Sequence, residues 1–461
     1  MSGMTRVLIV AQPTVGHVTA LITIGRRLLA SGADVRFALP FTRLPRIPLP
    51  SMIATALRLP KAVEAAGLRF VPLAPSLAQL AYGTAMPWTA GATELRLAAR
   101  LITAGSGSYV RQLEAELDRE GADVIVADFG FVAGLFVAER RRVPHVAFFH
   151  SGLPFPEGGE YPFTGGAVFS RSVDARIAPA RRSLGLPPAA PGFFDRPYSP
   201  DLNLLATAPA LEGRTTDYGP TTRWVGPCVD GRVETASFPL ERLRPDAVKV
   251  YLSLGTVFNG RADRFRAVIR GLTAPGVQLV VSAGESFAAL ESMAGPDLLI
   301  FPWVPQLAVL RSVDFVVSHG GNNTVNEALM AGRPLLVLPI GGEQEANARR
   351  VERLGAGIRL ERAPLGPESV REAFVRLTQE HGPRLRGRSR SRRHVPGDRV
   401  LRNIVSELRH HHGERRDHPG RPRHRTRGAR RRAGAAREPT GGSLVEAVVV
   451  ARRRSTVDTP R

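Results

Sequence analysis

The sequence predicts an α/β protein with two doubly wound domains, each built on a parallel β-sheet covered by helices on both faces. Its length of 461 residues exceeds what a single hydrophobic core usually supports. Short apolar runs alternate with helical stretches in the first half of the chain, and the alternation restarts near Val248. A hydrophobic content of 43% supplies enough apolar side chains for two buried cores.

The first half opens with a strand, a loop, a helix and a second strand. An apolar run from Val7 to Ala11 is followed by a turn-rich segment, a helical stretch to Ala30, and a second apolar run from Val35 to Leu39. This βαβ order implies parallel strands buried on both faces. Further elements of the same kind are expected at Asp123 to Ala127, Val132 to Arg141, His145 to Phe149 and Asn203 to Ala206.

The second half repeats this pattern. Its expected strands are Val248 to Leu252, Val277 to Val281, Leu298 to Phe301, Phe315 to Ser318 and Leu335 to Leu338. Its expected helices are Ala262 to Leu272, Asn323 to Met330 and Glu345 to Leu354. The predicted organisation is an N-terminal α/β domain (1–221), an interdomain linker (222–247), a C-terminal α/β domain (248–381) and an Arg-rich tail (382–461) with one helix at 399–408.

Two long segments rich in proline or glycine interrupt the first domain, at Pro40 to Pro60 and Leu153 to Pro200. Both are expected to be irregular. Loops above the carboxyl ends of parallel strands commonly contact ligands, so an acceptor-binding role and a simple surface connection both stay open.

The formal net charge of +22 is concentrated in the tail, where 23 arginines face 7 acidic residues from Gly382 to Arg461. A basic arm that binds a membrane surface or nucleic acid is one interpretation. An out-of-frame extension after about His410 is the other, because the chain has only two lysines and its tail resembles a shifted frame of a GC-rich gene. A single cysteine, Cys228, no apparent export signal and no apolar run long enough to cross a membrane favour the cytoplasm.

The most informative motif lies where the predicted strand Phe315 to Ser318 ends in His319-Gly320-Gly321, before a predicted helix. Glycines let the backbone approach a ligand, and the free amides and positive dipole of a helix start favour an anionic phosphate. The imidazole of His319 adds one donor. Ordinary helix caps have a similar sequence, so the turn by itself is compatible with a phosphate site and with a simple helix cap.

Residues nearby extend this turn to a nucleotide-sugar site. Glu327, early in the helix, is suited to a ribose diol, while Trp303 and Gln306 are suited to stacking on a base and bonding its edge. Glu343 and Gln344 follow the next strand, where sugar hydroxyls can be held. Together these residues resemble the donor-binding signature of family 1 nucleotide-sugar glycosyltransferases, especially bacterial natural-product members of macrolide or enediyne type. The resemblance implies the GT-B fold, in which two Rossmann-like domains face a central cleft. It also implies that the N-terminal domain (1–221) binds the acceptor and that the C-terminal domain (248–381) binds the donor.

The resemblance also assigns roles residue by residue. Ser253, Gly255 and Thr256 match a turn that contacts the diphosphate. Glu343 stands where the family usually has an Asp, so the resemblance does not define which sugar is transferred. The full set of donor ligands that it implies is Gly16, Ser253, Gly255, Thr256, Trp303, Val304, Gln306, His319, Gly320, Gly321, Asn322, Asn323, Thr324, Glu327, Glu343 and Gln344.

The same resemblance places the catalytic base at His17, after the first strand. An imidazole can take a proton from an acceptor hydroxyl as that oxygen attacks the anomeric carbon. Asp128 matches the carboxylate that orients this base and stabilises the imidazolium. Three other side chains are expected to serve packing, a strand cap or the acceptor wall, namely Asp123, His145 and His150.

The predicted activity is that of an inverting hexosyltransferase in antibiotic or other secondary metabolism. It moves a sugar from a thymidine or uridine diphosphate sugar to a hydroxyl of a small hydrophobic natural product. No metal or other cofactor is implied, because the helix dipole, the turn amides and His319 can balance the diphosphate charge. The expected partners are these two small molecules, with no specific nucleic acid and a homodimer left open.

Two alternatives remain. A nucleotide-sugar epimerase of the same fold shares the phosphate turn but does not need a Gly-His after the first strand. A catalytically impaired homologue that acts as a partner protein is the other.

Overall fold

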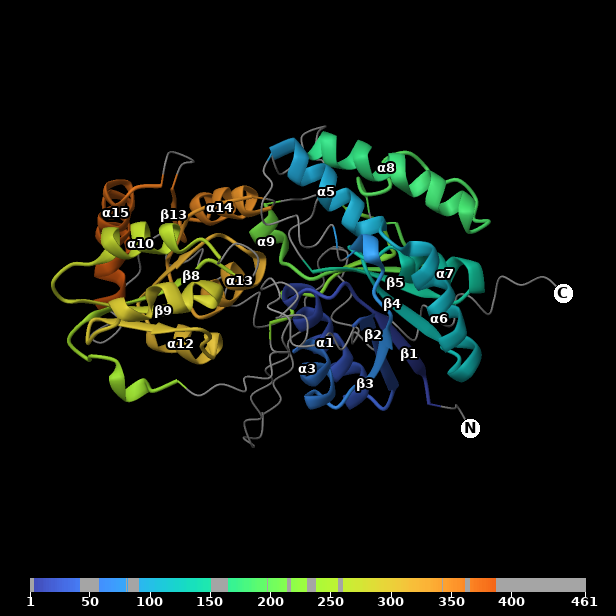
Figure 1. Cartoon of the computed structure of the whole chain (residues 1–461), viewed down its shortest axis with the longest axis horizontal. Coiled ribbons are helices and arrows are strands. Elements are labelled where there is room, and N and C mark those ends of the chain that lie inside the picture. The colour runs from blue at the N-terminus through green and yellow to red at the C-terminus, as the bar shows by residue number, and fades with distance from the viewer. Residues whose placement is uncertain are drawn as a thin grey trace, which may run out of the picture.

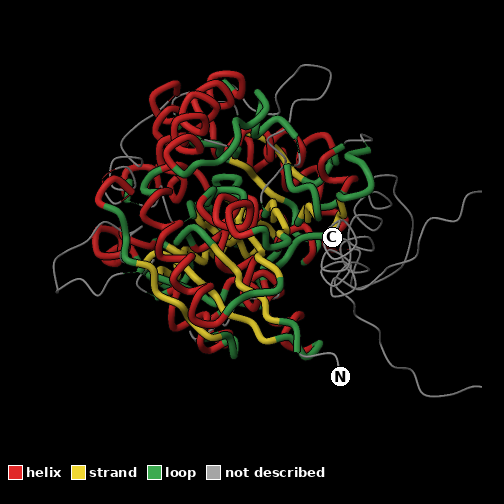
Figure 2. Tube along the Cα trace, turned by 90° about the vertical axis from the view of Figure 1, so that its right-hand side faces the viewer, coloured by secondary structure: helices red, strands yellow, loops and turns green. Residues whose placement is uncertain are grey.

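The computed structural model describes eleven parts of the chain, namely 4–41, 58–79, 81, 91–150, 165–196, 198–213, 217–229, 238–255, 260–341, 343–360 and 365–386. They form two α/β units, which lie side by side in Figure 1. In Figure 2, which views the molecule from one end, helices lie outside the strands. No helix among these residues is both long and apolar enough to cross a membrane.

The N-terminal sheet has seven strands, all parallel, in the order β3-β2-β1-β4-β5-β6-β7. Its strands are β1 (Arg6–Val10), β2 (Asp34–Pro40), β3 (Arg69–Leu73), β4 (Val124–Asp128), β5 (His145–Phe149), β6 (Leu202–Leu205) and β7 (Thr222–Trp224). Its helices are α1 (Val15–Ala30), α3 (Leu59–Ala65), α5 (Gly91–Thr103), α6 (Ser106–Glu120), α7 (Ala133–Arg141) and α8 (Gly166–Ser183).

Alternate residues of the central strand β1 serve the two faces of this sheet. Leu8 and Val10 belong to the apolar cluster formed with α6, α7 and α8, whereas Val7 and Ile9 belong to the cluster formed with α1 and α3. The strand is therefore apolar throughout, as expected for a sheet buried on both faces.

The C-terminal sheet has six parallel strands in the order β10-β9-β8-β11-β12-β13. Its strands are β8 (Val248–Ser253), β9 (Val277–Ser282), β10 (Leu298–Phe301), β11 (Phe315–Ser318), β12 (Leu335–Val337) and β13 (Gly357–Arg359). Its α-helices are α10 (Ala262–Leu272), α11 (Phe287–Leu290), α12 (Gln306–Ser312), α13 (Asn322–Met330), α14 (Gln344–Arg353) and α15 (Pro367–Arg386). Short 3₁₀ turns occur at Leu240–Arg242, Gly284–Ser286 and Glu291–Met293.

The α/β prediction and its expected strands are confirmed to within a residue or two at their ends. The prediction that Leu153 to Pro200 is irregular is wrong, because α8 occupies Gly166–Ser183 and packs along α5 (Figure 1). The predicted linker begins inside the sheet, since β7 pairs with β6. The predicted tail helix at 399–408 and most of Pro40 to Pro60 lie outside the described residues.

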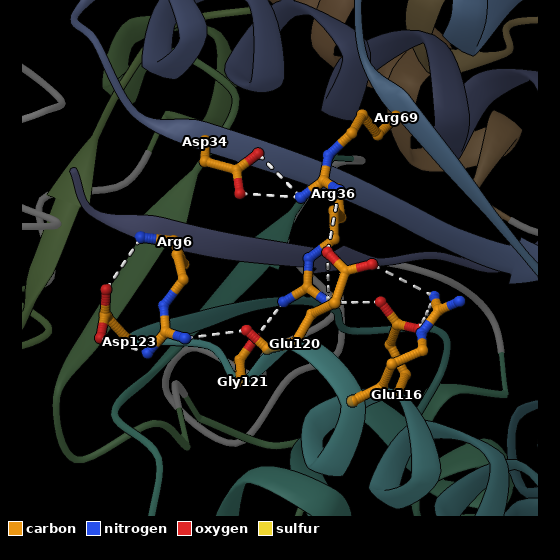
Figure 3. Close-up of polar contacts among 9 residues, drawn as sticks. Arg6, Asp34, Arg36, Arg69, Glu116, Glu120, Gly121 and Asp123 are labelled. Carbon is orange, nitrogen blue, oxygen red and sulfur yellow. Dashed lines mark hydrogen bonds and ion pairs between the residues drawn. The ribbon is translucent and has the colours of Figure 1, made fainter.

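Charged side chains join the strands at the amino edge of the N-terminal sheet, opposite the edge that carries the candidate site (Figure 3). The guanidinium of Arg36, only 1% exposed, contacts Glu116 and the carbonyl of Gly121 at the end of α6. Asp123 pairs with Arg6 and accepts its backbone N–H, so the prediction that Asp123 caps a strand start is confirmed. This edge fixes α6 to the sheet.

Candidate active site

The two groups of predicted site residues lie at equivalent places in the two sheets. In each sheet the strand order reverses beside the first strand of the domain, between β1 and β4 in one and between β8 and β11 in the other. Ligands of doubly wound proteins bind at the carboxyl end of this reversal. His17 and Asp128 lie at the first reversal, and Ser253 and His319 lie at the second.

His17, on the first turn of α1, points its ring at Asp128, the last residue of β4. The His17 Nδ1 atom lies 2.6 Å from Asp128 Oδ2. The Asp128 carboxylate is fully buried and also accepts the backbone amides of Gln12, at 3.1 Å, and Gly130, at 3.0 Å. Burial alone would raise the pKa of Asp128, but His17, His150 and the Gly130 amide together lower it. An anionic carboxylate therefore holds one nitrogen of a ring that is itself partly exposed.

His150, at the end of β5, lies against this pair. Its ring centroid is 3.5 Å from that of His17, and its Nδ1 is 3.8 Å from Asp128 Oδ1. Burial, and the charge of His17, lower the pKa of His150 well below its usual value, against the effect of Asp128. From the sequence, His150 is expected to serve packing or to line the acceptor wall. Its contact with His17 arises because two strand ends meet, which no local motif indicates.

Aromatic side chains surround the His17 side of the site. Phe129 stacks on His17 with ring centroids 6.0 Å apart, and it contacts Phe149 and Phe194 in turn. Tyr198, which the sequence analysis did not single out, packs on Phe149, and burial together with the charge of Asp128 raises the pKa of its hydroxyl well above the usual value. The wall beside the His17 ring is thus apolar and aromatic.

In the second domain, His319 is enclosed by glycines. A Cβ atom on Gly255 would lie 2.5 Å from the His319 ring, and one on Gly321 would lie 2.6 Å from it. Burial lowers the pKa of His319 to about 4, against an opposing hydrogen bond with the Ser253 backbone. The ring is therefore neutral at physiological pH. Gly320 follows it with φ of +90° and donates its N–H to Ser318 Oγ at 3.1 Å.

The residues predicted for the nucleoside lie together on α12 and α13. Gln306 Nε2 donates to Glu327 Oε2 at 2.6 Å and lies 3.4 Å from Thr324 Oγ1, and its Oε1 accepts the hydroxyl of Tyr251. Gln306 and Glu327 are both buried. Trp303 precedes them on the loop after β10, half-buried, with the guanidinium carbon of Arg58 at 6.0 Å from its ring centroid.

Val304, the neighbour of Trp303, packs against the apolar cluster beneath α12 and α13, and its donor-binding role stays a prediction. The hydrogen bond between Gln306 and Glu327 brings a predicted base ligand next to the predicted ribose ligand. Val304 contributes packing in this arrangement.

The predicted sugar ligands Glu343 and Gln344 lie at the start of α14. Gln344 Oε1 accepts the amides of Ile340, at 2.8 Å, and Gly341, at 3.0 Å, so this side chain closes the loop after β12. Burial raises the pKa of Glu343, while the charges of His17 and Arg350 act in the opposite direction by less. Glu343 therefore interacts electrostatically with a residue of each domain.

Two amide side chains at the start of α13 reach the N-terminal domain. Asn322 Nδ2 donates to the carbonyl of His150 at 2.7 Å. Asn323 Nδ2 lies 3.5 Å from the carbonyl of Gly16, directly before His17. The candidate base and the glycine turn thus face each other across the junction of the two domains. The donor-binding roles of Gly16, Asn322 and Asn323 stay predictions. Thr256 lies outside the described residues.

One group of side chains in the described part of the chain is close enough together to hold a metal ion. It consists of His17, Asp128 and His150, whose ligand atoms lie within 4.8 Å of one another. These are the residues of the candidate base, so an ion there would occupy the nitrogen and oxygen atoms that proton transfer requires. A metal-free reaction remains a prediction.

Part of the chain matches a family of known proteins. Residues 246–381 match the family model described as UDP-glucoronosyl and UDP-glucosyl transferase. The chain is 27% identical to the 4'-demethylrebeccamycin synthase of Lentzea aerocolonigenes, over 83% of this chain and 94% of that protein. It is 30% identical to the uncharacterized UDP-glucosyltransferase YdhE of Bacillus subtilis, but that match covers 38% of this chain and 44% of YdhE.

Solved structures share the whole architecture. The glycotransferase of kitacinnamycin superposes with a TM-score of 0.66 at 24% identity, covering 90% of this chain and 97% of that one. The calicheamicin glycosyltransferase CalG4 gives a TM-score of 0.63 at 23% identity, covering 88% and 95%. At these identities the likeness shows the fold.

Two parallel-sheet Rossmann-like domains that meet across such a site define a GT-B protein. The chain is a glycosyltransferase, and residues 246–381 are the part of it that matches the UDP-glucoronosyl and UDP-glucosyl transferase family. YdhE, the glycotransferase of kitacinnamycin and CalG4 are all named as transferases, which favours a transferase over an epimerase of the same fold.

Proposed function

We propose that the protein transfers a sugar from a nucleotide diphosphate to a hydroxyl of a small apolar natural product, with inversion at the anomeric carbon. The observation that carries this proposal is the His17–Asp128 pair, with its 2.6 Å contact, held opposite the His319-Gly320-Gly321 turn by Asn322 and Asn323. A base in one domain thereby faces a phosphate-binding turn in the other.

The pairing of His17 suits a single displacement. Because Nδ1 is held by Asp128, Nε2 is the nitrogen left to accept the proton of the acceptor hydroxyl. The acceptor oxygen bonds to the anomeric carbon, the bond from that carbon to the diphosphate oxygen breaks, and the proton passes to His17. Attack from the side opposite the leaving group inverts the anomeric centre.

The diphosphate that leaves carries negative charge. Backbone amides at the start of α13 and the dipole of that helix stabilise such charge without reorganisation. His319, being neutral, contributes a hydrogen-bond donor, and no resident metal is required by this proposal.

The substrates are proposed from the site wall and the relatives. Phe129 beside His17 favours an aromatic or otherwise apolar acceptor. The rebeccamycin synthase relative and the spinosyn rhamnosyltransferase SpnG, solved with thymidine diphosphate, point to an antibiotic-type aglycone and a thymidine diphosphate sugar, with a uridine diphosphate sugar as the other candidate. Secondary metabolism in the cytoplasm is the setting we propose.

The test is a donor and acceptor screen with mass detection of the glycosylated product. Thymidine and uridine diphosphate sugars are each offered with hydroxylated polycyclic and macrolide acceptors, and proton coupling at the anomeric carbon reports inversion. His17→Ala should lower turnover by about 100- to 10,000-fold while nucleotide affinity stays within about twofold. Conversion of the donor without an acceptor would instead support an epimerase, and near-normal turnover by the variant would remove His17 from the base role.

A further inference from the structure

A short helix from the N-terminal half of the chain is built into the C-terminal domain. This helix, α9 (Pro209–Glu212), follows β6 of the first sheet, yet Ala208 and Leu211 belong to the apolar cluster of the second domain together with Val351. Arg353 of α14 donates to the carbonyl of Leu211 at 2.9 Å. Figure 1 shows α9 beside α14, between the two sheets. After α9 the chain returns to the first sheet as β7.

The contact between α9 and α14 includes a buried ion pair. Glu212 Oε2 lies 2.5 Å from Arg350 Nη2, and the two side chains are 0% and 7% exposed. Thr207 donates its hydroxyl to the second oxygen of Glu212 at 3.1 Å. Charges taken out of water are tolerated only when paired and hydrogen-bonded. The pair therefore fixes the Arg350 guanidinium in one place.

Hydrogen bonds connect the same guanidinium, through Asn347, to the candidate phosphate turn. Arg350 Nη1 donates to Asn347 Oδ1 at 2.8 Å, and Asn347 Nδ2 donates to the carbonyl of Gly320 at 2.9 Å. All of these groups are buried. A connected polar chain thus runs from Glu212 to the turn that follows β11.

We propose that Glu212 and Arg350 are positioning residues for the nucleotide diphosphate, acting through Asn347 on the Gly320 peptide. This inference rests on the function proposed above. The peptide group is planar and trans, so holding the Gly320 carbonyl toward α14 turns the Gly321 N–H to the opposite side. The first domain in this way sets the direction of an amide at the start of α13, through the chain that runs from α9 across α14.

The test measures the dissociation constants of thymidine and uridine diphosphate by calorimetry on the full chain. Glu212→Leu combined with Arg350→Met removes both charges without leaving either one buried alone. Arg350→Lys keeps the charge, but a single ammonium replaces the fork that bonds Asn347 and Glu212 together. In both variants we expect the dissociation constant and the donor KM to rise by about 5- to 20-fold, with kcat at saturating donor within about threefold.

Arg353→Met is the matched control, because Arg353 also joins α14 to α9 but, among the described residues, forms no hydrogen bond with Asn347. It should bind nucleotide like the unchanged protein. Hydrogen exchange at the Gly321 amide should be faster in the two test variants only.

Nucleotide affinity equal to that of the unchanged protein in the double variant, or an equal loss in Arg353→Met, would overturn the positioning role. An unchanged protein that binds neither nucleotide would instead overturn the proposed function, and the two failures are therefore distinguishable.

Discussion

The side-chain amide of Asn322 donates a 2.7 Å hydrogen bond to the carbonyl of His150, and this bond joins the two domains beside the candidate base. The ring of His150 in turn contacts that of His17, with centroids 3.5 Å apart. His150 thereby links the start of α13 to the candidate base His17. A change at Asn322 should consequently affect catalysis more than folding.

Replacing Asn322 by Ala should lower kcat by about tenfold, because the domains lose one buried hydrogen bond that aligns the base with the donor. Asn326→Ala is the control, since Asn326 donates to the Asn322 carbonyl within the same helix. Steady-state kinetics and melting temperatures check this prediction. If both variants lose kcat equally, the alignment role of the interdomain bond is wrong.

Asp128→Asn should lower turnover by about 1,000- to 10,000-fold, because a neutral amide cannot stabilise a protonated His17 and can favour the wrong tautomer. The acidic limb of the pH–rate profile should move to lower pH for the same reason. Asp128 has a lowered pKa in the folded protein, so its contribution to stability is present above the unfolded value near 3.8 and is lost as pH falls below it. An unaltered profile in this variant would argue that Asp128 does not orient the base.

Gly255→Ala should destabilise the protein and weaken nucleotide binding. The new methyl group would lie 2.5 Å from the His319 ring and must displace it. Gly276→Ala is a matched control, since both glycines have φ near the same positive value, +77° and +76°, while nothing lies within 4 Å of a Cβ at Gly276. Both variants should lose about 1 kcal/mol of unfolding free energy to backbone strain. Only Gly255→Ala should lose nucleotide affinity, measured by calorimetry.

Stability should fall as pH drops from about 6.5 toward 4. The pKa of His319 is lowered to about 4 by burial, so over this range the unfolded chain binds a proton that the folded protein does not. This group alone should reduce the unfolding free energy by about 1 kcal/mol between about pH 7.5 and 5.5. Urea unfolding at these two pH values measures the change in the unfolding free energy. The variant His319→Asn should show a smaller dependence of that free energy on pH. A variant with the same pH dependence as the unchanged protein would contradict the prediction.

Removal of residues 411–461 should leave the melting temperature and the rate of sugar transfer unchanged if that arginine-rich stretch is an out-of-frame extension. A functional basic arm predicts that the full chain, and not the shortened one, is retained on DNA or anionic lipid at low salt and released at moderate salt. Loss of folding on removal would contradict both interpretations.

The strands could be predicted because most of them are short runs of apolar residues buried on both faces. Three weaker strands were missed, and each lies at an edge of its sheet. They are β3, which contains Arg69 and Pro72, and the three-residue strands β7 and β13. The helix α8 was missed because glycine and proline flank it and Pro179 lies inside it. The apolar residues Phe169, Val173 and Ile177, four apart, were the signal that could have revealed it.

The candidate site was predictable where one motif carries it, as in the glycine turn after β11. Contacts between distant segments were not predictable. His150 meets His17 because β4 lies between β1 and β5 in the sheet order, so the carboxyl ends of these three strands lie side by side. Glu212 meets Arg350 because α9 leaves its own domain, a path that no periodicity of the sequence indicates.

The course of α9 also bears on how such enzymes can be recombined. A chimera that joins the first half of this chain to the second half of a relative at the apparent linker would place Glu212 opposite a foreign α14. Where that α14 has no basic residue at the place of Arg350, the charge of Glu212 is buried alone. A crossover design should exchange residues 207–213 together with the C-terminal domain, as an insert separate from β6 and β7. The modular unit of this architecture is therefore discontinuous along the chain.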